Sequence, residues 1–223
     1  MRRPVAATGL VALTLSLCVA ISATATAKVT EMGELAADVR AGCPDACQAL
    51  ARVTGYQAKV GPERSLYQAP ADGRIVAWTI TLGDPNTRDT AAFQKRFGEV
   101  SQAAIVVLDA GEKLSRTVVA KAPLQALNDY FGQTIQFPLV DSLAIEKGQY
   151  IALTVPTWAP ALQVGLGPDT SWRSSRDAKG CLDTAPQFAL LGKRTSALFR
   201  CLYKGVRLTY SATFVSNPTP NPK

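Results

Sequence analysis

The sequence predicts an all-β fold, a jelly-roll-like antiparallel β-sandwich with about eight to ten strands and little helix. The clearest observation is the stretch from Gln133 to Pro156, where apolar residues fall on alternate positions. This is the period of a strand with one buried face. Glu146–Gln149 interrupts the alternation and includes a glycine, which predicts a hairpin turn. Strand-like runs recur at intervals of about ten residues and amphipathic helical patterns are almost absent, which together favour a sandwich.

The chain begins with the features of a secretory signal peptide over residues 1–27. Arg2 and Arg3 precede the apolar run Val11–Ile21, and residues 25–27 have the small-x-small pattern of a cleavage site. The apolar run is too short to span about 30 Å of hydrocarbon, and a signal anchor is the alternative. We therefore expect a secreted or extracellular protein, or one associated with the cell envelope, with no membrane span after the leader is removed.

The charge of the chain is modest. The formal net charge is +7, and Arg2 and Arg3 of the leader account for two positive charges, which leaves +7 − 2 = +5 for residues 28–223. The remaining cations are scattered, and the sequence has no basic stripe with interleaved aromatic residues, the pattern typical of nucleic-acid binding. We expect no nucleic-acid partner, and at most a weak attraction to anionic envelope polymers.

Four cysteines follow the leader and predict two disulfides, because exported proteins fold in an oxidising compartment. Pairing of Cys43 with Cys47 and of Cys181 with Cys201 is favoured over a crossed set, because the partners are close in sequence. A zinc site with four thiolate ligands would need paired C-x2-C knuckles, which the sequence lacks. We predict neither a metal site nor a cofactor.

One sandwich domain is expected over residues 53–216, because a single core accommodates a chain of this length. Residues 28–52 have a mixed pattern and are expected to form an N-terminal arm or a short helix. Residues 217–223 have proline at alternate positions from Pro218 and are expected to form a disordered tail.

Three further runs predict strands within this domain. Val76–Leu82 alternates apolar with small or polar residues and places Trp78 in the core. Ala103–Leu108 is apolar without a break, which suits a central strand covered on both faces. Val206–Phe214 alternates again and predicts a closing strand with one solvated face.

A loop and a short helical turn are expected after the first of these strands. Gly83–Asp89 is rich in turn-forming residues, and Ala91–Phe97 has the spacing of one helical turn. The side chains of Asp84, Asn86 and Asp89 are loosely similar to a calcium loop. A plain turn is favoured because the glycine and the distal glutamate of an EF-hand are missing.

The absence of histidine excludes several enzyme classes. Ser-His-Asp and Cys-His hydrolases and most catalytic zinc sites require an imidazole. Hydrolysis by paired carboxylates, as in glycoside hydrolases, survives as an alternative. The acids that would serve it are Asp169, Asp177, Asp183 and Glu146. Solvated turn positions are the ordinary role of such acids, and we assign no catalytic residue.

The favoured function is ligand binding in and beside the polar segment Gly167–Gly180, which has no periodicity. Trp158 and Trp172 flank a short strand and are expected in loops, where an indole offers a flat apolar face with a donor on its edge. Such a face suits a sugar ring. The predicted ligand-binding residues are Trp158, Asp169, Trp172, Arg173 and Arg176.

Each tryptophan also has a structural alternative, in which the indole folds back as a lid over one end of the sandwich. We favour the lid for Trp158 and leave both readings open for Trp172. The expected protein is therefore a monomeric, non-catalytic binding or envelope-associated module whose partner is a polysaccharide or cell-wall polymer. Besides the glycoside hydrolase, the alternative is a purely structural envelope protein that uses its uncovered sheet edges.

The sequence contains the pieces GRIVAWTITLG, YFGQTIQFPL, KGQYIALTVPTWAPAL, GLGPDTSW and CLYKGVRLTYSATF. These pieces resemble a group of secreted, predicted β-sandwich proteins of uncharacterised function from high-GC Gram-positive bacteria, over about Cys43 to Phe214. The resemblance implies export and a sandwich, and it implies no activity. The pattern from Leu143 to Leu153 is also similar, at the level of fold alone, to a hairpin of jelly-roll carbohydrate-binding modules.

Overall fold

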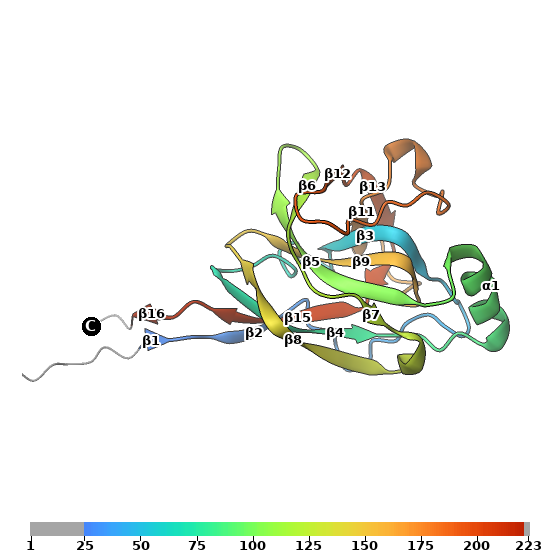
Figure 1. Ribbon diagram of the computed structural model, residues 1–223, viewed down its shortest axis with the longest axis horizontal. Helices are drawn as coiled ribbons and strands as arrows, with labels where there is room; N and C mark the ends of the chain where they lie inside the picture. Colours follow the sequence, from blue (N-terminus) through green and yellow to red (C-terminus); the bar gives the residue numbers. More distant parts are fainter. Residues whose placement is uncertain (1–24, 221–223) are drawn as a thin grey trace, which may run out of the picture.

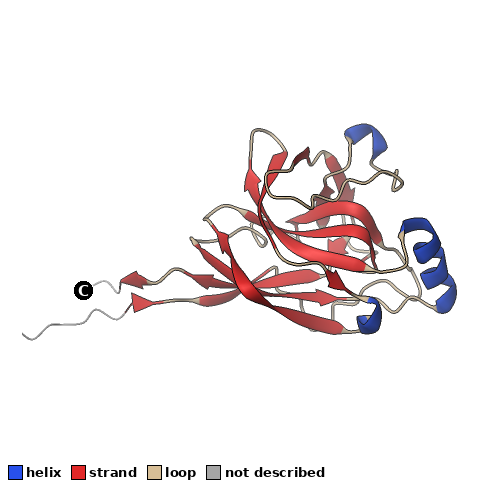
Figure 2. Cartoon of the chain, in the orientation of Figure 1, coloured by secondary structure: helices blue, strands red, loops and turns tan. Residues whose placement is uncertain are grey.

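The computed structural model describes residues 25–220, and its fold is the predicted all-β sandwich. Two antiparallel sheets pack face to face, and one α-helix lies at an end of the sandwich (Figure 1). Strands dominate the chain and helices are few (Figure 2). The signal peptide predicted for residues 1–27 lies outside the described residues except for its last three positions.

The smaller sheet has four strands in the order β2-β15-β4-β8. Their bounds are Val29–Met32 for β2, Tyr210–Ser216 for β15, Gly73–Thr81 for β4 and Thr134–Ile145 for β8. The closing strand β15 therefore lies between two strands from the N-terminal half of the chain.

The larger sheet follows the order β12-β6-β5-β9-β3-β11-β13, and β7 pairs with β5 beside this path. The bounds are Ser196–Leu198 (β12), Ser115–Lys121 (β6), Gln102–Ala110 (β5), Tyr150–Ala159 (β9), Leu50–Lys59 (β3), Ser171–Ser174 (β11), Cys201–Lys204 (β13) and Gln125–Ala126 (β7). Two further pairs of short strands lie outside both sheets: β1 (Ala25–Thr26) with β16 (Thr219–Pro220), and β10 (Leu162–Gln163) with β14 (Arg207–Leu208). The helices are α1 (Thr87–Phe97) and the 3-10 turns η1 (Asn128–Tyr130) and η2 (Ala178–Gly180).

The main apolar core lies between the two sheets. Trp78 of β4 and Phe214 of β15 belong to the same buried cluster as Ile105 and Leu153 of the larger sheet. Burying side chains of this size stabilises the fold by about 1.5–3 kcal/mol each. The prediction that Trp78 is a core residue is confirmed.

The larger sheet is covered on both faces. Every residue of Ala103–Leu108 is buried, and successive side chains on a strand point to opposite faces. Ile105 and Val107 face the core between the sheets, whereas Val106 and Leu108 belong to a second cluster on the outer face. The structure thus confirms the prediction of a central strand with no polar face.

The larger sheet curls until its two outermost strands lie close together. Only Phe199 and Arg200 separate β12 from β13, which stand at opposite ends of the strand order. So short a link spans at most about 11 Å between the flanking Cα atoms. The sheet therefore bends around the second cluster, where the fully buried Phe199 packs against Tyr56 with 5.4 Å between ring centroids.

Residues 175–190, which we call the strap, cross the outer face of the larger sheet with little regular structure. At one end of the strap, Ser175 exchanges two hydrogen bonds with the backbone of Thr54 on β3. At the other end, the backbone N–H of Leu190 donates to the Thr54 hydroxyl, and its carbonyl accepts from the hydroxyl of Thr154 on β9. The strap is therefore anchored at both ends to the two central strands.

The helix α1 begins earlier than the predicted turn at Ala91, because Asn86 caps it at Thr87. The Asn86 side chain accepts from the backbone N–H of Asp89 at 3.0 Å and donates to its carboxylate at 2.9 Å. Asn86 and Asp89, two of the three residues whose spacing is loosely similar to a calcium loop, therefore cap the helix.

The terminal segments of the domain contain short strands. Residues 28–52, expected to be an arm or a short helix, begin with β2 and end with the start of β3, and no helix forms between them. Met32 of β2 is buried in the core, which ties this arm to the smaller sheet. The tail 217–223, expected to be disordered, contains β16, and residues 221–223 lie outside the described residues.

Both predicted disulfides are confirmed, Cys43 with Cys47 and Cys181 with Cys201. Within residues 25–220, none of the helices has the length and apolar character needed to cross a membrane.

Candidate binding pocket

Trp158 lies in β9 and not in the predicted loop, and it is fully buried. Its indole N–H donates to the carbonyl of Gly98 at 2.9 Å. Its ring packs against Phe93 of α1 and against Phe131, with centroid distances of 5.1 and 5.4 Å. This is the lid arrangement, and the expectation that Trp158 exposes an indole face to a ligand is wrong.

Trp172 lies in the strand β11 and is only 4 % exposed. Because β11 pairs with β3 on one side and with β13 on the other, the tryptophan lies within the sheet. Its ring stacks on Tyr203 of β13 with 4.3 Å between centroids, and it packs over Gly55 of β3, which has no side chain to obstruct it. The expectation of an exposed stacking face in a loop is wrong for this residue too.

Asp169 and Arg173 do not line a pocket with Trp172. Asp169 is exposed in the turn before β11. Arg173 follows Trp172 on the strand, so its side chain points to the opposite face. There its guanidinium donates to the carbonyls of Phe199 and Arg200 at 3.1 and 3.3 Å.

The structure does bring Trp172 and Arg176 together, in a pocket of about 210 Å³ between the strap and the strands β3, β11 and β13. The apolar part of its wall comes from Leu50, Leu162 and Val206, and Tyr203 lies beside Trp172. The strap contributes Arg176, Cys181, Leu182 and Thr184.

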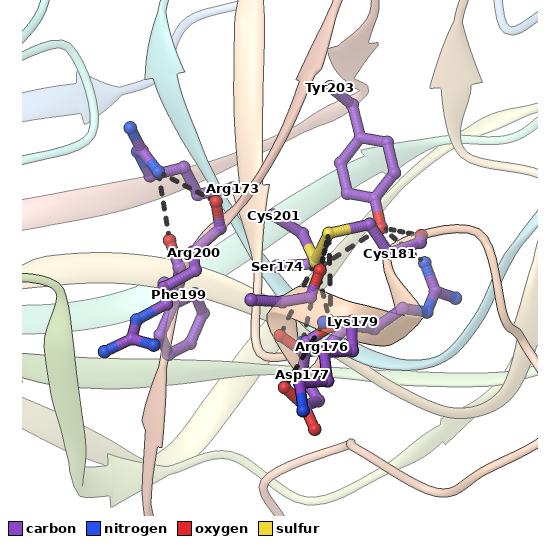
Figure 3. Close-up of a disulfide and its surroundings, with 11 residues drawn as sticks. Arg173, Ser174, Arg176, Asp177, Lys179, Cys181, Phe199, Arg200, Cys201 and Tyr203 are labelled. Carbon is purple, nitrogen blue, oxygen red and sulfur yellow. Dashed lines mark hydrogen bonds between the residues drawn. A yellow bond between two sulfur atoms is a disulfide. The ribbon is translucent and has the colours of Figure 1, made fainter.

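Arg176 is the charged group of this pocket and is only 5 % exposed. Its guanidinium donates to the Tyr203 hydroxyl at 3.1 Å and to the carbonyl of Ala51 at 2.7 Å. The Tyr203 hydroxyl in turn donates to the carbonyl of Cys181. Figure 3 shows Arg176 and Tyr203 beside the Cys181–Cys201 disulfide, which ties the strap to β13 and so holds Arg176 near Tyr203.

Three side chains that line the pocket have a buried polar atom without a hydrogen-bond partner among the described residues. They are the indole nitrogen of Trp172, the Nε of Arg176 and the hydroxyl of Thr184. Leaving a buried polar group unpaired costs about 1–3 kcal/mol. These atoms are themselves closed off from the cavity, and Trp78, Arg116 and Arg207 have similar unpartnered nitrogens elsewhere. The pocket is the candidate site because it places the buried charge of Arg176 beside the stacked rings of Trp172 and Tyr203.

The acids of the hydrolase alternative do not line this pocket. Asp177 accepts from the backbone N–H of Lys179 and Asp183 from that of Ala185, so both close turns. Glu146 lines a separate groove. The structure therefore does not bring all of these acids together at one site.

A larger hollow, of about 920 Å³, lies between the edge strand β8 and the strand β6. Leu139–Ser142 bulges out of β8 there and fully exposes Val140. Arg74 holds the bulge by donating to the carbonyl of Ser142 at 2.7 Å. None of the unpartnered buried side-chain atoms of the described chain belongs to this groove, so the smaller pocket is the stronger candidate.

Sequence reasoning missed Tyr203 and the two strap residues Leu182 and Thr184 as parts of the site. A usable signal is the position of Cys181, because a disulfide from Cys181 to Cys201 places the residues after each cysteine near one another. The polar segment before Cys181 did point to Trp172 and Arg176, which the structure brings together.

Comparison with known proteins found no match: no family model, no curated protein and no solved structure matches this chain. The resemblance to secreted proteins of high-GC Gram-positive bacteria therefore stays a prediction.

Proposed function

We propose that the protein is an exported, non-catalytic binding module that holds one terminal unit of a carbohydrate or cell-wall polymer in the pocket at Arg176. The observation that carries this proposal is the buried guanidinium of Arg176, which lines this cavity with Trp172 and Tyr203 and bonds only neutral groups. A buried charge is costly unless an opposite charge pairs with it, so a charge of this kind beside a cavity favours a role in binding.

The size of the pocket supports a single small unit as the ligand. Its volume of about 210 Å³ is below the roughly 300–1,000 Å³ typical of sites for drug-sized molecules. Leu182 on its rim is 89 % exposed, so the rest of a polymer would continue into solvent.

Export is supported by the leader pattern and by the disulfides. The Cys181–Cys201 bond lies in the wall of the pocket, and such a bond persists in an oxidising compartment. An extracellular or envelope location would bring the pocket into contact with the polymers proposed as ligands.

The test is retention of the pure protein on cell-wall sacculi and on insoluble polysaccharides, compared with its Thr184→Val variant. Valine keeps the shape of threonine, whose side chain lines the pocket, and removes its buried hydroxyl. We expect the change to weaken retention about five-fold, the effect of losing one hydrogen bond of about 1 kcal/mol. The matched control is Thr79→Val, at a half-buried position on the smaller sheet that does not line this pocket.

Equal retention of the two variants would remove the pocket from the proposal. Absence of retention on every polymer by the folded protein would contradict the binding function itself, and would favour the purely structural envelope role.

A further inference from the structure

We propose that the pocket selects an acidic unit, so that its ligand presents a carboxylate to Arg176. This inference rests on the proposed function and specifies the chemistry of its ligand. The first observation is that Arg176 alone is charged among the described residues that line the pocket.

The charge of Arg176 is not neutralised by its own hydrogen bonds. The guanidinium donates to the Tyr203 hydroxyl and to the Ala51 carbonyl, both of which are neutral. A buried charge is costly unless an opposite charge pairs with it. A ligand that brings a negative charge into the pocket therefore gains more binding energy than a neutral ligand of the same shape.

The guanidinium of Arg176 favours an acceptor over a donor, because it has only N–H donors. A carboxylate accepts at two oxygens and forms stronger hydrogen bonds with charged donors than neutral oxygens do.

The indole nitrogen of Trp172 and the Nε of Arg176 are closed off from solvent. The carboxylate is therefore attracted first by the field of Arg176, which acts across several ångströms at low dielectric. The apolar wall of Leu50, Leu162 and Val206 suits the C–H face of a sugar ring. The shared chemistry is a carboxylate, which a uronic acid or the carboxyl end of a short wall peptide could supply.

The test is an NMR titration that follows the indole N–H resonance of Trp172, with the resonance of Trp158 as an internal control. The Trp158 indole is bonded to Gly98 away from the pocket, so it should not move. The probes are sodium glucuronate, glucose, sodium acetate and the dipeptide alanyl-alanine. We expect glucuronate to bind about ten-fold more tightly than glucose, the gain typical of a charged over a neutral hydrogen-bond acceptor. Tighter binding of the dipeptide than of glucuronate would assign the carboxylate to a peptide and would keep the inference.

Variants at the rim test the charge without disturbing the fold, because Leu182 is almost fully exposed. We expect Leu182→Lys to strengthen glucuronate binding and Leu182→Glu to weaken it, by about two- to five-fold each, with Leu182→Gln between them. The control Leu202→Glu changes the net charge equally at an exposed position that does not line the pocket, and should leave binding unchanged.

Equal affinity for glucose and glucuronate would overturn the carboxylate inference and leave the proposed function standing. Equal weakening by Leu202→Glu would also overturn it, because the effect would then come from net charge. If no probe shifts the indole resonance of Trp172 while the protein is still retained on polymers, the inference that this pocket binds an acidic ligand is wrong. If retention is also absent, the proposed function fails with it.

Discussion

The hydroxyl oxygens of Thr54 and Thr154 lie 2.8 Å apart, at positions directly opposite each other on β3 and β9. Both side chains are fully buried in the outer face of the larger sheet. The same two hydroxyls bond the backbone of Leu190, at 2.8 Å from its N–H and 3.2 Å from its carbonyl. Because the strap also carries Arg176 and Thr184, this pair of threonines fixes one side of the pocket to the sheet.

We expect Thr154→Val to destabilise the protein by about 1–3 kcal/mol, although valine has nearly the same shape. The change leaves the buried carbonyl of Leu190 without its hydrogen bond from Thr154 and leaves the Thr54 hydroxyl without an acceptor for its proton. Urea denaturation followed by circular dichroism measures the free energy of unfolding. The control is Thr79→Val on the smaller sheet, whose hydroxyl accepts one long bond of 3.5 Å. A loss no larger than that of the control would show that the network contributes little.

The protein should lose stability as the pH rises above about 10, the ordinary pKa of tyrosine. Burial raises the pKa of Tyr67 and raises that of Tyr210 well above its usual range. Both hydroxyls donate to buried carbonyls, Tyr67 to that of Tyr210 and Tyr210 to that of Ile151. The unfolded chain therefore releases these protons at a lower pH than the folded chain, so stability is full below about pH 10 and falls above it.

Urea denaturation at pH 8 to 11, with tyrosinate absorbance of the folded protein, measures this dependence. In Tyr67→Phe the decline between pH 10 and 11 should be shallower than in the unaltered protein, because one raised group is gone. A stability that stays constant to pH 11 would contradict the assignment.

The long strands could be predicted from the sequence, because apolar residues at alternate positions are typical of a strand with one buried face. Tyr150–Ala159 and Thr134–Ile145 are strands as expected, and the break at Glu146–Gln149 separates them. The disulfides follow as well, since local pairs close the shortest loops.

The burial of Trp172 does not follow from the sequence. Residues 167–180 are polar and have no periodicity, which indicates a loop. The short strand β11 forms within this stretch because β3 and β13 supply hydrogen-bond partners on both sides. The pocket could not be predicted from the sequence either. Its lining residues Leu50, Leu162 and Thr184 are far apart in the chain, and only the folded sheet brings them together.

The two disulfides should differ in their contribution to stability. The Cys181–Cys201 bond closes a loop with a sequence separation of 20, and the Cys43–Cys47 bond a loop with a separation of 4. Loop entropy predicts that removing the first bond costs about 3 kcal/mol and removing the second about 2 kcal/mol.

The double variants Cys181→Ala/Cys201→Ala and Cys43→Ala/Cys47→Ala allow a direct comparison by thermal denaturation. Only the first should also weaken retention on polymers, because Cys181 lines the pocket. An equal loss of retention in both would argue that general stability, and not the pocket wall, controls binding.

Gly55→Ala should disturb the pocket by pushing against the ring of Trp172. A Cβ at this position would lie 2.8 Å from two ring carbons of Trp172, which is closer than real side chains approach. The ring stacks on Tyr203 at 4.3 Å, so it cannot move aside without displacing that residue. We expect a loss of about 1–3 kcal/mol in the free energy of unfolding, the usual cost of overpacking, and a shifted Trp172 indole resonance.

The matched control for this glycine is Gly180→Ala, where the added Cβ would meet its nearest neighbour, in Asp183, at an ordinary 3.7 Å. We expect its stability to stay within about 0.5 kcal/mol of the unaltered protein, as for most surface changes. If Gly55→Ala were as stable as this control and its Trp172 resonance unchanged, the tryptophan would not be held against β3.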